Sequence, residues 1–298
     1  MKNAQLRGYI FAIISAVSFG LIPIFILPIK KVEFSIDTTL FYRFFFSVLM
    51  VGSCLVFRKE NFKVNIREAS ILLVLGLFYA FSSDFLFLGY DYLSAGIAST
   101  ALFIYPVLVA LIMFFVYKEK MSKLSAFSLA LAFLGVLILC LKEGELNINF
   151  TGLGIVLLSS LCYALYMVIV NKARLPISGF KLSFYSMLFT SLYYFGKVIA
   201  KDESLIVPNV QLLINFIIFA FVTTLISSLT LVYAIKIIGS TPTAILGALE
   251  PIIAVLISVL MFGEHFTINL LIGIILILSG VILNIISESK SKKKSPKK

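Results

Sequence analysis

Glu250 is the residue of this chain best placed to carry chemistry, because it lies near the middle of a long apolar segment, residues 239–266. An ionisable side chain at mid-depth in a bilayer is costly, so it normally faces a cavity or a partner and marks a functional site. The adjacent Pro251 cannot donate a backbone hydrogen bond, which leaves a carbonyl one turn earlier free to bind. Such a carboxyl group can hold a cationic ligand, or pass a proton from one side of a membrane to the other.

The segment around Glu250 has an earlier copy at residues 94–121. Pro106 stands in the first copy where Pro251 stands in the second, and one offset of 145 positions aligns the two segments. Tyr105 then takes the position of Glu250, so the two copies would give a substrate cavity two different chemistries. We expect this duplicated membrane helix to be broken near its middle, and such a helix with one buried acid is typical of a transporter.

Arg43 and Asp84 form a second set of candidates, because both are expected about 8 Å below the same membrane surface on neighbouring helices. Opposite charges at one depth should pair, since either one alone in lipid is expensive. We expect this pair to have a structural or gating role rather than to bind substrate. The alternative is that Arg43 extends to the lipid headgroups beside Glu33 or Asp37.

Hydroxyl groups inside apolar segments supply the remaining substrate-binding candidates: Ser83, Tyr163, Thr224 and Ser227. In membrane helices such groups line polar sites, but they also simply hydrogen-bond neighbouring helices. The one histidine, His265, is expected at a membrane surface, and the chain has no acidic cluster. We therefore expect no metal site and no cofactor. No nucleophile and base are expected at matched depth, so an intramembrane enzyme is not predicted.

Composition indicates an integral membrane protein. Hydrophobic residues make up 61% of the chain and charged residues 13%, whereas soluble domains carry roughly 25% charged residues. The net charge of +11 does not indicate nucleic-acid binding, because the basic residues sit in short connections and in the C-terminal tail. The three cysteines all lie in apolar segments and are expected to be core residues rather than a disulfide framework.

About ten apolar stretches are long enough to cross a bilayer, given roughly 20 residues per crossing. Because lipid offers the backbone no water, such stretches must be helices. We therefore predict an all-α integral membrane protein with ten transmembrane helices. The predicted spans are residues 8–27, 38–57, 69–89, 95–117, 124–141, 152–171, 180–200, 210–235, 240–262 and 267–286.

The basic residues of the connections predict the orientation. Most of them lie on the side that also carries both termini, even when the lysine-rich tail is left aside. The positive-inside rule makes that side cytoplasmic. We therefore predict a multi-pass protein of the cell (inner) membrane, with both termini in the cytoplasm and residues 144–149 outside.

The repeat extends over the whole chain and predicts two five-helix halves, residues 1–141 and 152–287, followed by a basic tail at residues 288–298. Because each half has an odd number of helices, the second half must enter the membrane inverted. Inverted repeats are found in secondary transporters, whose substrate site lies near the midplane between the halves. Corresponding positions include Gly8 and Gly152, Ser15 and Ser159, Ser82 and Ser227, Ser83 and Ser228, and Gly135 and Gly280.

These features resemble the ten-helix EamA-type branch of the drug/metabolite transporter superfamily. The resemblance rests on a duplicated helix in which a proline precedes a glutamate (Pro106 with Glu119, Pro251 with Glu264), on Arg43 in the second span, and on the glycine that opens each half. Similar proteins move amino acids, nucleobases, sugar phosphates, vitamins or toxic cations. The resemblance implies alternating-access transport, often export, through a cavity lined by helices one, three and four and by helices six, eight and nine.

We therefore predict a secondary transporter that exports a small polar metabolite, such as an amino acid or a derivative; a proton gradient could be coupled through Glu250. An exporter of lipophilic cations, with Glu250 as counter-charge, is the alternative within transport. A passive channel or a membrane protein without transport activity is the alternative of another class. The expected partners are a small-molecule substrate, protons and the lipid bilayer, without nucleic acid, and the expected state is a monomer or a homodimer.

Overall fold

The computed structural model describes residues 2–31, 34–89, 91–93, 98, 101–119, 121–140, 149–262 and 268–294. Within these ranges the ordered elements are helices, and no strand is found there. The all-helical fold predicted from the sequence is confirmed. The predicted positions Glu33, Glu264, His265 and residues 144–148 lie outside the described residues.

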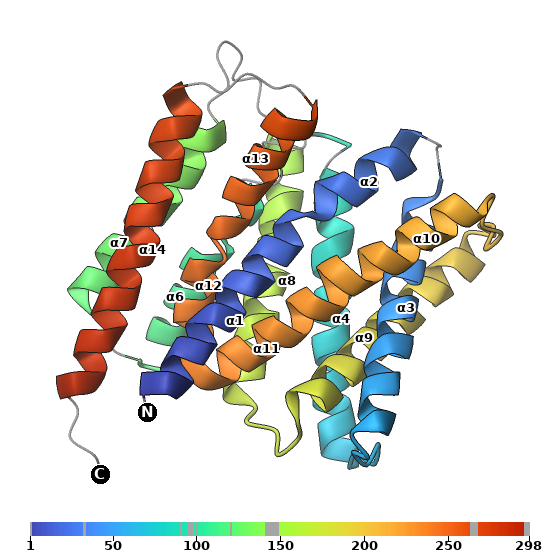
Figure 1. Cartoon of the computed structure of the whole chain (residues 1–298), viewed down its shortest axis with the longest axis horizontal. Helices are drawn as coiled ribbons and strands as arrows, with labels where there is room; N and C mark the ends of the chain where they lie inside the picture. Colours follow the sequence, from blue (N-terminus) through green and yellow to red (C-terminus); the bar gives the residue numbers. More distant parts are fainter. Residues whose placement is uncertain are drawn as a thin grey trace.

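The helices before residue 141 are α1 (Lys2–Gly20), α2 (Ile22–Lys31), α3 (Ile36–Phe57), α4 (Ile66–Gly89), α6 (Tyr105–Phe115) and α7 (Lys123–Cys140). The later helices are α8 (Phe150–Lys172), α9 (Gly179–Ala200), α10 (Val210–Phe219), the π-helix η1 (Ala220–Ile226), α11 (Ser227–Ile238), α12 (Ser240–Leu246), α13 (Leu249–Phe262) and α14 (Ile268–Lys294). They form one bundle, in which the start of α1 and the end of α14 lie at the same end (Figure 1). We call this the terminal end and the opposite one the far end.

Several helices begin where the sequence supplies a capping side chain. Ser35, Asn149, Ser178 and Asn209 each accept a hydrogen bond from a backbone N–H group in the first turn of α3, α8, α9 and α10, respectively. Such caps satisfy donors that the helix itself leaves without a partner. The boundaries of these four helices therefore follow directly from local sequence.

Five helical stretches among the described residues are long and apolar enough to cross a membrane: Ala4–Ile26, Ile36–Phe57, Ile66–Gly89, Phe150–Lys172 and Val210–Ile238. They coincide with five of the predicted spans. Large apolar side chains are also exposed on the outside of the bundle, among them Leu49, Phe115 and Ile275. An exterior of this kind suits contact with lipid. The full count of ten spans stays a prediction.

The predicted ninth span is broken into α12 and α13, and the break lies immediately before Glu250. Gly247 N–H donates to the Thr243 carbonyl at 3.1 Å, and Glu250 N–H donates to the Gly247 carbonyl at 2.9 Å. Pro251 then falls in the first turn of α13, where its missing N–H group leaves no intrahelical bond unmade. The fourth predicted span has the same design, because α6 begins at Tyr105 with Pro106 beside it.

The most extensive helix contacts join the two halves of the chain. α7 packs on α14, α3 on α9, α4 on α8, and α1 on α11. Glycines permit the α7–α14 contact: a Cβ at Gly135 would lie 2.7 Å from the Gly273 carbonyl oxygen, and a Cβ at Gly280 would lie 2.7 Å from that of Ser128. The centre of the bundle lies between these cross-half pairs.

The connections at the terminal end also hold the halves together. Ser178, in the α8–α9 connection, donates a hydrogen bond to Glu60 in the α3–α4 connection. Arg58 forms an ion pair with the same carboxylate at 2.9 Å. The Ser178 hydrogen bond, followed by the Arg58 contact, lowers the pKa of Glu60. The carboxylate is therefore favoured in its ionised form at this connection.

Candidate substrate-binding site

Glu250 lies in the first turn of α13 and is only 5% exposed. α1 crosses at this point, since a Cβ at Gly20 would lie 2.9 Å from the Glu250 carbonyl oxygen. Tyr105 and Tyr163 lie near the Glu250 side chain. Among the described residues, the carboxylate has neither a hydrogen-bond nor an ion-pair partner. The partial positive charge at a helix N-terminus is the favourable field that remains.

Tyr105 lies against the helix break that precedes Glu250. Its ring is 1% exposed and meets the Tyr163 ring edge-on, with the centroids 4.8 Å apart. A Cβ at Gly247 would lie 1.8 Å from the Tyr105 hydroxyl oxygen. Glycine is therefore required at the α12–α13 break, because any side chain there would occupy the place of this hydroxyl group. Glu250, Tyr105 and Tyr163 are brought together in one place.

Aromatic rings lead from Tyr163 into the centre of the bundle. Tyr163 stacks with Phe19 and with Tyr166, each at a centroid distance of 6.3 Å. Phe44 follows further along, with its centroid 5.5 Å from that of Tyr79 and 5.8 Å from that of Tyr194. We call this set the aromatic row: Phe19, Phe44, Tyr79, Tyr105, Tyr163, Tyr166 and Tyr194. Glu250 lies at one end of it.

Arg43 lies beside the Phe19 and Phe44 rings of the aromatic row and is 3% exposed. Its Nε donates to Thr224 Oγ1 at 2.6 Å, and its Nη2 makes a longer contact of 3.5 Å with the Thr223 carbonyl oxygen. The guanidinium carbon lies 4.9 Å from the centroid of the Phe219 ring and 5.5 Å from that of Phe44. Within the described part of the chain, no acidic side chain pairs with Arg43.

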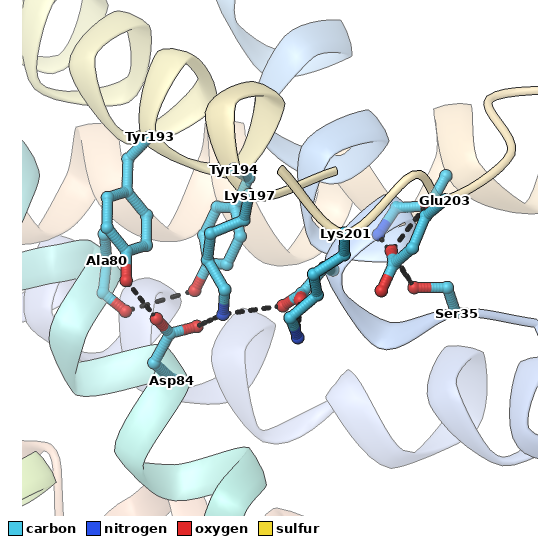
Figure 2. A network of polar contacts seen from close by, with 10 residues as sticks. Ser35, Ala80, Asp84, Tyr193, Tyr194, Lys197, Lys201 and Glu203 are labelled. Carbon is cyan, nitrogen blue, oxygen red and sulfur yellow. Dashed lines mark hydrogen bonds and ion pairs between the residues drawn. The ribbon is translucent and has the colours of Figure 1, made fainter. Parts of the chain in front are cut away.

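The predicted pairing of Arg43 with Asp84 is therefore wrong. Asp84 accepts a hydrogen bond from Tyr193 at 2.5 Å and forms an ion pair with Lys197 at 2.9 Å. Figure 2 shows both partners reaching Asp84 from α9. Because α9 packs against both α3 and α4, a lysine of α9 reaches this carboxylate and the arginine of α3 does not. Arg43 does not extend towards Asp37 either, since it is buried against Thr224.

Lys197 is the centre of an ion network at the far end of the bundle. It contacts Asp37 of α3 at 2.8 Å as well as Asp84 of α4, and Lys201 contacts the second oxygen of Asp37 at 2.6 Å (Figure 2). Nearby, Ser35 donates to Glu203. The network therefore ties two helices of the first half to one helix of the second half. No sequence signal singled out Lys197.

Replacing Lys197 with Met should destabilise the protein, because it leaves Asp84 without its counter-ion in a half-buried position. We expect a loss of roughly 2 kcal/mol, measured as a lower midpoint of thermal unfolding in detergent. Adding Asp84→Asn should recover part of the loss, while Lys63→Met in an exposed connection serves as the control. A Lys197→Met protein with the unfolding midpoint of the unaltered chain would show that the network contributes nothing to stability.

Most of the predicted hydroxyl candidates form hydrogen bonds with other groups of the protein. Ser83 donates to the Tyr79 carbonyl at 3.2 Å, and Ser227 lies 3.4 Å from the Ser15 hydroxyl. Ser82 and Ser159 make the matching contact at 3.3 Å. Ser15, Ser82, Ser159 and Ser227 therefore make helix–helix contacts in this structure, whereas Ser83 bonds within its own helix, α4.

Thr224 differs from the serines, because it belongs to η1 and binds Arg43. π-Helices are rare and occur frequently at functional sites. Ser47 donates to the Ala220 carbonyl of η1 at 3.0 Å and so satisfies one acceptor of the widened turn. No sequence signal marked this π-helix beyond the unusual run of hydroxyl residues around Thr224.

A polar cavity of about 260 Å³ opens at the terminal end, between α6, α7, α12 and α14. Glu119 lies at its edge and pairs with Lys172 at 2.6 Å. α6 runs from Tyr105 to this cavity, and α12 runs from the cavity to the break at Gly247. Two of the helices that border the cavity, α6 and α12, therefore lead to the Glu250 site. The polar lining of the cavity consists of Glu119, Ser122, Ser125, Asn171, Ser240, Thr241 and Ser287.

Comparison with known proteins agrees with this architecture. The model of the EamA-like transporter family matches the chain twice, over residues 6–141 and over residues 150–286. The chain belongs to this family. It is therefore a multi-pass membrane protein of a transporter family, and a small-molecule substrate follows from that membership.

Relatives of this EamA-like protein are themselves named transporters. The uncharacterized transporter YdfC of Bacillus subtilis is 23% identical over 77% of this chain and 75% of its own length. An uncharacterized transporter of Archaeoglobus fulgidus is 25% identical over 91% of this chain and 93% of its own. These names point to transport rather than to an enzyme. One solved crystal structure superposes with a TM-score of 0.79 over 99% of this chain and 100% of that one, at 16% identity, which shows a shared fold.

Proposed function

We propose that this EamA-like protein is a secondary transporter that exports a small polar metabolite, such as an amino acid or a derivative, from the cytoplasm. The observation that carries the proposal is the Glu250 carboxylate, which is 5% exposed at a helix break and has no counter-ion among the described residues. A buried charge without a protein partner is suited to a mobile partner, which is a substrate cation or a proton.

The pattern of contacts supports two related, inverted halves. The Ser15–Ser227 contact and the Ser82–Ser159 contact join the same two repeat positions in opposite order. At the level of helices, α1 with α11 corresponds in the same way to α4 with α8. A two-fold axis in the membrane plane would exchange these pairs, and such axes relate the halves of alternating-access transporters.

The two ends of the bundle differ, and this difference suggests how substrate reaches the site. We place the terminal end, with its polar cavity, on the cytoplasmic side, so that substrate enters between α6 and α12 and moves towards Tyr105 and Glu250. The Lys197 network closes the far end in this conformation. Export then requires the α6–α12 side to close and the far-end contacts to separate.

Transport is coupled to protons if Glu250 binds the substrate cation and a proton in turn. The ionised carboxylate holds a cationic group of the substrate that enters from the cytoplasm. When the far side opens, a proton binds to the carboxylate and the substrate leaves. The protonated site then returns and releases the proton inside. One proton moves inward for each substrate exported, so a proton gradient drives the export.

The orientation can be measured by labelling single cysteines with a membrane-impermeant reagent, after the native cysteines have been replaced. A cysteine at position Asn147 should be modified in intact cells, since the basic residues predict that this connection lies outside. A cysteine at position Lys63 is the matched control and should be modified only after lysis. The reverse pattern would contradict the orientation.

Transport itself is tested with purified protein in liposomes that contain a cell metabolite extract. Mass spectrometry would measure which solutes leave, with and without a pH gradient that is acidic outside. We expect a small polar solute to leave faster than from protein-free liposomes, and the gradient to accelerate it. Release of lipophilic cations alone would favour the alternative exporter, and no protein-dependent release of any solute would overturn the proposed function.

A further inference from the structure

Arg43 has a charge that no acidic side chain of the described residues balances. A guanidinium group stays protonated in proteins, so burial cannot neutralise it. A buried charge of this kind is costly unless it is paired. The nearby acids at the far end, Asp37 and Asp84, are already paired with Lys197 and Lys201. An anion from outside the protein would supply the partner that the described residues do not provide.

The guanidinium group has free donors for such an anion. Of its five N–H groups, one on Nε binds Thr224 and one on Nη2 makes the long contact with Thr223. No hydrogen bond to a described residue is found for Nη1. The Nη1–Nη2 edge is the fork that binds a carboxylate or phosphate through two parallel hydrogen bonds.

The surroundings hold this fork in a fixed orientation. Phe219, Phe44 and Phe19 lie within 4.9, 5.5 and 5.7 Å of the guanidinium carbon, measured to the ring centroids. Thr224 fixes the Nε side from the π-helix. A cation that is shielded from water and already oriented binds an anion with little further loss of conformational freedom.

The position of Arg43 relative to Glu250 indicates a ligand with two charges. Phe19 lies beside Arg43 and stacks with Tyr163. Tyr163 also meets Tyr105, which rests against the break before Glu250. Tyr163 lies near both Arg43 and Glu250. A cation and an anion that have no counter-ion among the described residues thus lie near one set of rings.

We propose that the substrate is a zwitterion, whose anionic group binds Arg43 and whose cationic group binds Glu250, with its apolar body against the aromatic row. The inference rests on the proposed transport function and names its substrate class. An amine without an anionic group would leave Arg43 unpaired, and a carboxylate without an amine would leave Glu250 unpaired. A zwitterion satisfies both charges together.

The test uses three solute panels in the same liposome exchange assay. The first contains α-amino acids and betaines, the second the corresponding amines without the carboxylate, and the third the corresponding acids without the amine. We expect exchange of members of the first panel, and at least about tenfold slower exchange of their one-charge counterparts, because each leaves a buried charge unpaired.

Arg43 is then changed to Met and to Lys, with Arg67→Met at the exposed start of α4 as control. Arg43→Met should abolish zwitterion exchange while the unfolding midpoint is kept or raised, since an uncompensated buried charge is removed. Arg43→Lys should retain a small part of the exchange, because it keeps the charge and loses the fork. Arg67→Met should behave like the unaltered protein.

Three results would overturn the zwitterion inference while leaving the transport function intact. The first is exchange of the amines as fast as that of their zwitterionic counterparts, with neither rate changed in Arg43→Met. The second is exchange of metabolites from the cell extract while no member of the zwitterion panel exchanges. The third is an Arg43→Met protein that unfolds at a lower temperature and loses exchange of all solutes equally. Such a result would show that Arg43 has a structural role. Failure of the extract itself to exchange would instead overturn the proposed function.

Discussion

Replacing Glu250 with Gln is expected to reduce transport driven by a proton gradient by roughly ten- to a hundredfold. Gln keeps the shape of the side chain but neither titrates nor carries the charge. The loss corresponds to about 1.5–3 kcal/mol for a charge-assisted contact. Exchange at saturating substrate without a gradient should persist, because it needs no net proton movement. Efflux from liposomes with and without an imposed pH gradient measures both quantities.

Two further variants make the Glu250 result specific. Glu250→Asp should keep part of the activity with a shifted pH optimum, since it retains a titrating group at a different reach. Glu68→Gln is the matched control, because it changes the same residue type in an exposed helix start where the side chain accepts a backbone hydrogen bond. A Glu250→Gln protein with unaltered rate and pH dependence would make Glu250 a structural residue.

Replacing Gly247 with Ala is expected to have the second large effect. The added methyl group would lie 1.8 Å from the Tyr105 hydroxyl oxygen and 3.0 Å from the Ala244 carbonyl oxygen. Tyr105 would have to leave its place beside Glu250, and overpacking of this kind costs about 1–3 kcal/mol. We expect a lower unfolding midpoint and a steep fall in exchange, measured on the same preparation.

A second substitution can show whether the conflict with Tyr105 causes the losses in Gly247→Ala. Tyr105→Phe removes the atom in closest conflict, so it should restore part of the stability of Gly247→Ala. The recovery should be incomplete, because the ring carbon that bears the hydroxyl would still lie 3.0 Å away. Gly154→Ala in α8 is the control, since a Cβ there meets nothing within 4 Å. Unchanged stability and exchange in Gly247→Ala would show that Tyr105 is not held as described.

The sequence was sufficient to predict the helical membrane fold and the break beside Glu250. Proline acts on its own backbone, so Pro106 and Pro251 marked the starts of α6 and α13 without any knowledge of tertiary contacts. The constant offset between the copies also predicted that Tyr105 and Glu250 occupy related positions. Both inferences depend on information that is local or repeated in the chain.

The partners of the charged residues could not be predicted in the same way. Position along a span gives the depth of Arg43 and Asp84 but not the direction in which each side chain points. Lys197 lies on a helix more than 100 residues away from Asp84 in sequence, and it reaches Asp84 only because α9 packs against both α3 and α4. Pairing by depth alone therefore chose the wrong cation.

The aromatic row was also beyond prediction from sequence. The chain has 29 phenylalanines, and lipid-facing and buried ones have the same composition around them. Phe44 is 0% exposed and its neighbour Phe45 is 37% exposed. Their difference comes from the face of α3 on which each residue lies, and α3 has apolar residues all round.

The most direct test of the central claim is whether transported solute protects Glu250 from a hydrophobic carbodiimide, which modifies protonated carboxyl groups in apolar surroundings. Mass spectrometry of the digested protein would give the modified fraction of Glu250. We expect modification of Glu250 in the absence of solute, and a progressive loss of that modification as solute from the exchange assay is added. Modification that is unchanged at solute concentrations that saturate exchange would contradict a substrate site at Glu250.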